Sequence, residues 1–180
     1  EEIYDLQDAL VCAQFLMSFI RNADVVKVAN LAQIANVIAP VLTKDDKLLR
    51  QTIFEALAMF VGRRAGNSLR LGYSGPVVPS PEFDSVAMLD GAAILSEDNE
   101  LYVFAVNRST EANVELTVEL SGSHLEPVSC DLLHHSDPTT QNTWDNPDSV
   151  RRSQIEMSSG LSPVIELPPH CLVAMTLKVS

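Results

Sequence analysis

The sequence has few cysteines, few basic residues and no long apolar run. Its 180 residues include three cysteines, and 12 lysines and arginines stand against 24 aspartates and glutamates, a net charge of −12 at pH 7. No apolar run reaches the roughly 18 residues that a membrane-spanning helix needs. A surface of this charge repels phosphate backbones and anionic lipids. The composition therefore argues against a nucleic-acid or membrane partner and leaves neutral ligands such as sugars open.

The three cysteines form neither a closely spaced metal-ligand pattern nor an even set of disulfides. We expect Cys12, Cys130 and Cys171 to be buried free thiols. Free thiols favour a reducing, cytoplasmic location, and the alternative is secretion, where the sequon Asn107-Arg108-Ser109 would matter. Because the chain begins directly with a helical pattern at Glu1-Glu2-Ile3-Tyr4, we expect a fragment or a processed chain.

The first 64 residues alternate between two kinds of pattern. Apolar residues at three- and four-residue spacing predict helices over residues 4–21 and 47–64. Residues 25–33 are β-branched at first and apolar at odd and even positions, which predicts a strand buried on both faces, with a short helix as the alternative. Residues 34–46 are expected to connect strand and helix. This order is typical of an α/β barrel or a doubly wound sheet.

Beyond Gly72 the sequence becomes a series of short alternating runs. Prolines and glycines mark residues 73–83 as a linker. Alternation then predicts strands that form a β-sandwich of jelly-roll type; they cover residues 85–96, 100–106, 113–120, 125–133, 154–157, 164–167 and 172–179. In the last of these we expect Cys171, Val173, Met175 and Leu177 to face one way. The polar residues 136–152 are predicted to form a loop.

Groups able to act as acid, base or nucleophile are few. Glu55 is interpreted as a solvated helix charge, and Asp45 and Asp46 as charges at a helix N-terminus. Adjacent His134 and His135 on a strand would point to opposite faces and could not easily hold one ion. We therefore assign no catalytic residue, no metal site and no cofactor. The remaining candidates carry no recognisable motif; they are Ser68, Ser74, Ser121, Ser158, Asp137, Trp144 and His170.

Three amides interrupt the otherwise apolar stretch ANLAQIANVIAP, residues 29–40. An amide in apolar surroundings costs free energy unless it is hydrogen-bonded. If residues 25–32 form a barrel strand, Gln33 lies at its carboxyl end, where such barrels build their active sites. There it could bond a sugar hydroxyl. Equally, Gln33 or Asn36 could cap backbone groups of the following loop.

Several linked motifs resemble one known family. They are YDLQDALV from Tyr4, FIRNADVVK from Phe19, NLAQIANVIAP from Asn30, RQTI from Arg50 and FAVNR from Phe104. Together they resemble the α-L-arabinofuranosidases of glycoside hydrolase family 51. The resemblance implies a (β/α)8 TIM barrel followed by a jelly-roll sandwich. Residues 1–72 would be the C-terminal part of the barrel, 73–83 the linker and 84–180 the sandwich.

The resemblance also implies an activity and a binding residue. The family hydrolyses terminal non-reducing α-L-arabinofuranosyl groups with retention, and the glutamine of its LAQ motif, here Gln33, contacts the arabinose. Asn30 and Asn36 would then satisfy loop backbone. The two catalytic glutamates lie on earlier barrel strands, so this chain alone should be inactive and should need the N-terminal part of the enzyme as its partner. The family is often oligomeric, so a homo-oligomer is possible. A non-catalytic sugar-binding or scaffolding sandwich is the alternative.

Overall fold

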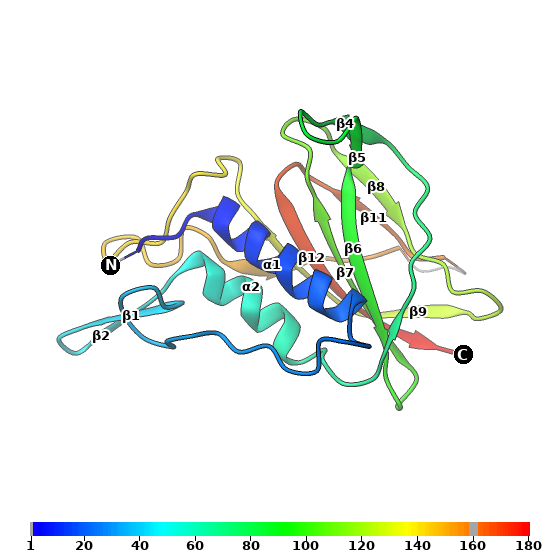
Figure 1. The fold of residues 1–180 in the computed structure, drawn as a ribbon, viewed down its shortest axis with the longest axis horizontal. Coiled ribbons are helices and arrows are strands. Elements are labelled where there is room, and N and C mark those ends of the chain that lie inside the picture. Colours follow the sequence, from blue (N-terminus) through cyan, green and yellow to red (C-terminus); the bar gives the residue numbers. More distant parts are fainter. Residues whose placement is uncertain (1, 159–161) are drawn as a thin grey trace.

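The computed structural model describes residues 2–158 and 162–180, which contain two helices and twelve strands (Figure 1). The helices are α1 (Leu6–Arg21) and α2 (Thr52–Val61). Neither of these two helices of the described residues is long and apolar enough to cross a membrane. The strands, in chain order, are β1 (Val41–Lys44), β2 (Lys47–Arg50), β3 (Asn67–Leu69), β4 (Val77–Pro79), β5 (Ser85–Ala87), β6 (Leu89–Leu95), β7 (Glu100–Asn107), β8 (Val114–Thr117), β9 (Leu125–His134), β10 (Arg152–Gln154), β11 (Val164–Leu167) and β12 (Cys171–Val179).

A six-stranded antiparallel sheet forms the centre of the molecule, in the order β10-β9-β12-β7-β6-β3. Strand β12 lies inside this sheet between β9 and β7, and it is apolar at odd and even positions, so both of its faces are buried. Leu172 and Ala174 belong to one core cluster and Cys171, Val173, Met175 and Leu177 to the other. The predicted facing of the last four is therefore confirmed.

The two faces of this sheet carry different layers (Figure 1). Both helices cover one face, where Leu10, Met17 and Met59 join one core cluster and the Phe60 ring stacks on Phe104 with centroids 4.1 Å apart. The short antiparallel pair β8 and β11 covers the other face and closes the second cluster. The strands thus form a sandwich, and the helices add a third layer.

The helices run in the same direction, side by side on the sheet (Figure 1). A capping box between Asp5 and Asp8 satisfies the backbone at the start of α1. Because the helices are parallel, the connection from Arg21 to Thr52 has to return along their whole length. Residues 22–40 make that return, and the hairpin β1–β2 follows beside the start of α2.

The strand predicted over residues 25–33 is not formed, so this prediction is wrong for the chain by itself. Residues 22–25 are turns, and the backbone from 26 to 34 is irregular. A strand needs neighbours for its N–H and C=O groups. This segment lies along the helices, and no strand among residues 2–158 and 162–180 lies beside it. Its apolar side chains face solvent, with Val25, Val28 and Ile34 72%, 74% and 75% exposed.

The helix predicted from residue 47 begins later, at Thr52. Residues 41–44 and 47–50 form the hairpin β1–β2 instead, because Leu42 and Leu49 stand opposite each other and are both buried. Asp45 and Asp46 therefore make the hairpin turn and are not helix charges. Helix α2 ends at Val61 with Gly62 as its cap, three residues before the predicted end at residue 64.

In the second half of the chain most of the predicted strands are confirmed. The run 85–96 divides into β5 and β6, and the strand expected at 154–157 lies at 152–154. Strands β3 and β4 were not predicted. Gly66 precedes β3 at a φ of +134°, where a Cβ atom would lie 2.3 Å from the Leu95 carbonyl oxygen, so glycine lets β3 approach β6.

Candidate functional site

Gln33 lies on the exposed return segment, in a stretch of unusual backbone. Its φ is 57°, and Asn36 and Val37 also have positive φ, at 63° and 59°. Such values are uncommon outside glycine, and for a β-branched residue such as Val37 they are strained. Strain of this kind collects at binding and catalytic sites, because surrounding contacts must hold it. The contacts that hold this backbone conformation therefore show how the position of Gln33 is fixed.

Asn36 fastens the Gln33 stretch to the hairpin. Its Oδ1 accepts hydrogen bonds from the Thr43 backbone N–H at 2.7 Å and from the Thr43 hydroxyl at 3.2 Å. Its backbone N–H donates to the Val41 carbonyl at 2.8 Å, and Ala35 forms a bridge with Val41. The prediction that Asn36 satisfies loop backbone is confirmed, while those for Asn30 and Gln33 stay predictions.

Gln51, just before α2, anchors the other end of the stretch, and no local sequence pattern predicts this role. Its side chain is buried and donates to the carbonyls of Ala39 at 2.8 Å and Glu2 at 3.2 Å, while its Oε1 accepts from the Tyr4 N–H at 3.0 Å. The Glu2 N–H in turn donates to the Val37 carbonyl at 2.7 Å. The start of the chain, the loop and α2 are thereby joined by one amide.

Glu55 is buried, so its interpretation as a solvated helix charge is wrong. Only 3% of its side chain is exposed, and three guanidinium groups surround its carboxylate: Arg151 at 2.6 Å, Arg152 at 3.8 Å and Arg50 at 4.0 Å. Burial raises the pKa of Glu55, against the opposing effect of Arg50 and Arg152. Because these arginines occupy its carboxylate, Glu55 ties α2 to the loop before β10 and is not free to act on a substrate.

The other polar candidates remain dispersed. His134 ends β9, and its Nδ1 is buried without a partner in the described structure. The His135 Nδ1 contacts the Thr140 hydroxyl at 2.9 Å and accepts from the Asp137 N–H at 3.1 Å, which orders a surface turn. Trp144 is half-buried in the predicted loop. Within residues 2–158 and 162–180, no three His, Cys, Asp or Glu side chains come together as a metal site.

The remaining serine and histidine candidates also have local structural positions. Ser68 lies in β3, and Ser158 pairs with Val164 through its hydroxyl and backbone. Ser74 and Ser121 line a shallow polar hollow beside the turn after β8. His170 has a φ of 50° and forms the turn into β12, as predicted.

Two of the three cysteines and the asparagine of the sequon are buried in the folded chain. Cys130 and Cys171 are buried free thiols, as predicted, and burial raises the pKa of each to about 12. Cys12 is free and partly buried. Asn107 is fully buried, and its amide donates to the carbonyls of Ala112, Leu167 and Pro168 at 3.0, 3.2 and 2.9 Å. The sequon is therefore inaccessible to glycosylation in the folded chain.

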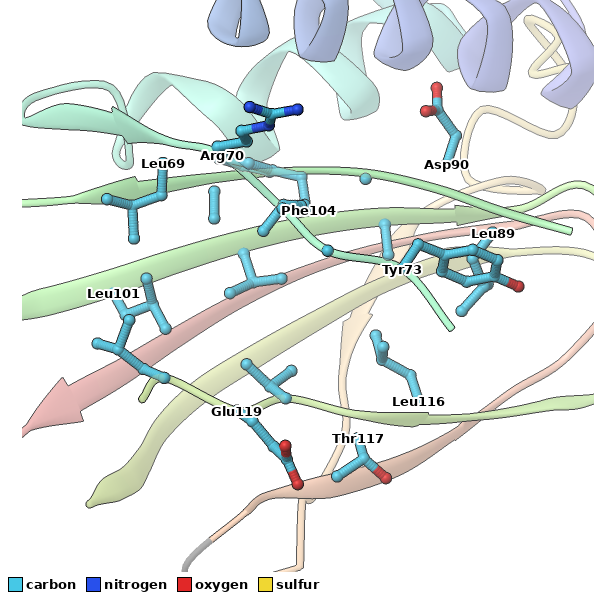
Figure 2. Close-up of a pocket in the computed structure, with 18 of the residues that line it drawn as sticks. Leu69, Arg70, Tyr73, Leu89, Asp90, Leu101, Phe104, Leu116, Thr117 and Glu119 are labelled. Atoms are coloured by element: carbon cyan, nitrogen blue, oxygen red, sulfur yellow. The ribbon is translucent and has the colours of Figure 1, made fainter. Parts of the chain in front are cut away.

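A cavity of about 390 Å³ lies between the main sheet and β8 (Figure 2). Leu69 and Leu101 line one end and Tyr73 the other, with Glu119 on the β8 side. Asp90, at its edge, is paired with two arginines. The lining is mainly apolar and comes from Arg21, residues 69–73 and later strands, so this cavity shares no residue with the Gln33 stretch.

Comparison with known proteins identifies the family. The family model of the alpha-L-arabinofuranosidase C-terminal domain matches residues 1–170. The chain belongs to that family. An intracellular exo-alpha-(1->5)-L-arabinofuranosidase of Bacillus subtilis is 35% identical over 92% of the chain, and one of Streptomyces lividans is 34% identical over 83%. These matches span only 33% and 23% of the two relatives, so the chain corresponds to about a third or less of their length.

Solved structures of the same family share the fold. A family 51 alpha-L-arabinofuranosidase from Bifidobacterium longum aligns with 98% of the chain at a TM-score of 0.90 and 26% identity. A family 51 arabinofuranosidase from Xanthomonas axonopodis pv. citri aligns with 99% at a TM-score of 0.89 and 25% identity. The chain covers 34% and 36% of these structures. The resemblance to glycoside hydrolase family 51 is therefore confirmed for the C-terminal part of such enzymes.

Proposed function

We propose that this chain is the C-terminal part of a retaining α-L-arabinofuranosidase, which removes terminal non-reducing α-L-arabinofuranosyl groups from arabinan, arabinoxylan or their oligosaccharides. The observation that carries the proposal is the match of the family's C-terminal domain over residues 1–170. Relatives that are 34–35% identical are named as arabinofuranosidases, which supports the same substrate class. The polymer and linkage depend on parts of the enzyme outside this third.

In this proposal the first part of the chain completes a catalytic (β/α)8 barrel. Residues 25–33 are its last strand, and α1 and α2 are the helices before and after it. Parallel helices joined by a returning segment are the arrangement that a β/α barrel requires. Residues 1–72 would then belong to the barrel, 73–83 to the linker and 84–180 to a jelly-roll sandwich, although β3 already pairs with β6.

The proposed partner of this chain is the N-terminal part of the same enzyme. The outer face of α1 carries a stripe of exposed apolar side chains, with Val11 50%, Phe15 61% and Phe19 38% exposed. These residues are four apart and therefore adjacent on the helix surface. Exposed apolar surface of this kind, together with that of residues 25–34, is typical of an interface. A free-standing sandwich module would have no use for it.

The chemistry would be shared between the two parts. Retaining glycosidases use two carboxyl groups roughly 5 Å apart, one as nucleophile and one as acid and then base. We propose that both glutamates lie in the N-terminal part, so that this chain is inactive alone. Its own contribution is Gln33, whose side-chain amide can donate to one arabinose hydroxyl and accept from another. Because those bonds hold the sugar ring at the carboxyl end of the strand, they orient it toward the carboxylates.

We also propose a cytoplasmic location and a homo-oligomeric enzyme. Relatives from Bacillus subtilis and Streptomyces lividans are named intracellular. The buried, unpaired Cys130 and Cys171 suit a reducing compartment. Size measurement of the complete enzyme by light scattering tests the oligomer, and a mass equal to one chain would contradict it.

The experiment for the site is Gln33→Ala in the complete enzyme. Loss of hydrogen bonds to the sugar should reduce kcat/KM on an aryl α-L-arabinofuranoside by about 1–3 kcal/mol in transition-state terms. Gln154→Ala, an exposed glutamine on the edge strand β10, is the matched control and should leave kcat/KM unchanged. Unaltered kinetics in Gln33→Ala would reduce Gln33 to a structural residue, and a complete enzyme inactive on arabinofuranosides would contradict the proposed activity itself.

A further inference from the structure

The hairpin β1–β2 has one buried face and one exposed face. In an antiparallel pair, residues directly opposite each other lie on the same face, and the next pair lies on the other. Leu42 and Leu49 are opposite each other and are 1% and 3% exposed. The next pair is Thr43 with Leu48, and Leu48 is 61% exposed. A large apolar side chain is thus displayed on the outer face.

The Gln33 stretch pairs with the edge of β1 that is not bonded to β2, and it reaches the outer face of the hairpin at Thr43. Asn36, three residues after Gln33, hydrogen-bonds the Thr43 hydroxyl, with its Nδ2 at 3.0 Å. Because Thr43 and Leu48 are cross-strand neighbours, their Cβ atoms are separated by roughly 5 Å. Leu48 therefore lies on the outer face next to Thr43, the residue through which the loop that carries Gln33 reaches that face.

The hairpin is held in place at its base. Leu42 and Leu49 are buried on its inner face, and the side chain of Gln51, directly after β2, bonds the carbonyl of Ala39, two residues before β1. The Gln51 N–H donates to the Pro40 carbonyl at 2.9 Å, which closes the base again. Figure 1 shows the hairpin projecting beyond the start of α2, away from the sandwich. Leu48 therefore lies on a hairpin whose base is held by hydrogen bonds and buried side chains, and not on a flexible loop.

We propose that the β1–β2 hairpin forms a wall of the sugar site and that Leu48 contacts the part of the saccharide beyond the terminal arabinosyl group. This inference rests on the proposed function, in which Gln33 binds that terminal group. Loops that follow barrel strands line the active site, and the hairpin lies in the loop between residues 25–33 and α2. An apolar side chain beside a polar anchor is the usual lining of a ligand site. Leu48 thus favours oligosaccharides over substrates with a small leaving group.

The test compares Leu48→Ala with wild type in the complete enzyme on two substrates. On an arabino-oligosaccharide, kcat/KM should fall roughly tenfold, as expected when a few methylene contacts are removed. On methyl α-L-arabinofuranoside, whose leaving group is too small to reach Leu48, it should stay within about twofold, and inhibition by free arabinose should not change. Val128→Ala, which removes an aliphatic side chain that is 57% exposed on β9, is the control and should alter neither substrate.

The outcomes separate this inference from the proposed function. If Leu48→Ala leaves kcat/KM unchanged on both substrates, or reduces it equally on both, the hairpin does not contact the rest of the saccharide and the inference is overturned. Gln33→Ala should instead reduce both substrates and weaken arabinose inhibition. If Gln33→Ala lowers kcat/KM and Leu48→Ala does not, only the role of the hairpin is overturned. If Gln33→Ala leaves kcat/KM unchanged, the proposed sugar site itself is contradicted. A matching Tm for all variants excludes misfolding.

Discussion

The central sheet and the return segment, residues 22–40, are both rich in apolar residues but behave oppositely. In the sheet, β12 has a strand on each side and a layer over each face, and it is buried from Cys171 to Leu177. The return segment has strand-forming residues at its start, yet it is irregular and exposes Val25 and Val28. Hydrogen-bond partners and covering layers therefore decide the difference, because an isolated strand cannot satisfy its own backbone.

The largest effect is expected from a cavity in the core on the helix side of the sheet. Phe104→Ala removes a fully buried ring that stacks on Phe60, and it should destabilise the chain by about 3–5 kcal/mol. Urea denaturation followed by circular dichroism measures the change. A loss below about 1 kcal/mol would mean that the helices are not packed on the sheet as described.

A smaller loss is expected where β7 ends. Asn107→Ala leaves three carbonyls without their donor, which should cost about 2–3 kcal/mol by the same denaturation measurement. Asn113→Ala is the matched control, since the Asn113 amide bonds only the exposed Glu166 carboxylate among the contacts described, and its cost should be below about 1 kcal/mol. Equal costs for the two variants would contradict the buried role of Asn107.

Val28→Ala sharpens the comparison directly. In this chain alone the substitution should change stability by less than about 0.5 kcal/mol, because the side chain is 74% exposed. In the complete enzyme, where we propose that residues 25–33 become a buried strand, Tm should fall by about 3 °C. Differential scanning calorimetry of both forms measures this. Equal small effects in both would contradict the barrel proposal.

The smallest effect concerns the thiols. Burial raises the pKa of Cys130 and Cys171 to about 12, so at pH 8 both stay protonated and unreactive. Burial also raises the pKa of Cys12. A thiol-specific chromogenic reagent should therefore label at most one cysteine rapidly in the folded chain and all three in urea. Two or more rapid labels without urea would contradict the packing around β12.

Much of the sheet could be predicted from local pattern alone. The strands β7, β9 and β12 are apolar-rich runs of strand length between turn residues, and the facing of Cys171, Val173, Met175 and Leu177 follows from the two-residue period of any strand. The hairpin β1–β2 was missed because Leu48 and Leu49 also suit the period of the helix that follows. The buried pair Leu42 and Leu49 becomes visible only through cross-strand register.

The site was less predictable than the fold. Gln33 could be singled out because a polar side chain in an apolar stretch requires a partner. Gln51 and Glu55 could not, because each also depends on a partner far along the chain: Gln51 bonds Tyr4, 47 residues away, and Glu55 pairs with Arg151, 96 residues away. In our proposal, the apolar pattern of residues 25–33 is that of a strand which becomes buried only in the presence of the rest of the enzyme.

Hydrogen–deuterium exchange over residues 25–33 tests the central claim most directly, because it measures whether the segment gains partners. In this chain alone the amides should exchange without protection, since the backbone is irregular and exposed. In the complete enzyme the same amides should be protected by several orders of magnitude, at the level of β12. Unprotected amides in both forms would contradict the proposal that this segment is the last strand of a barrel that presents Gln33 to the sugar.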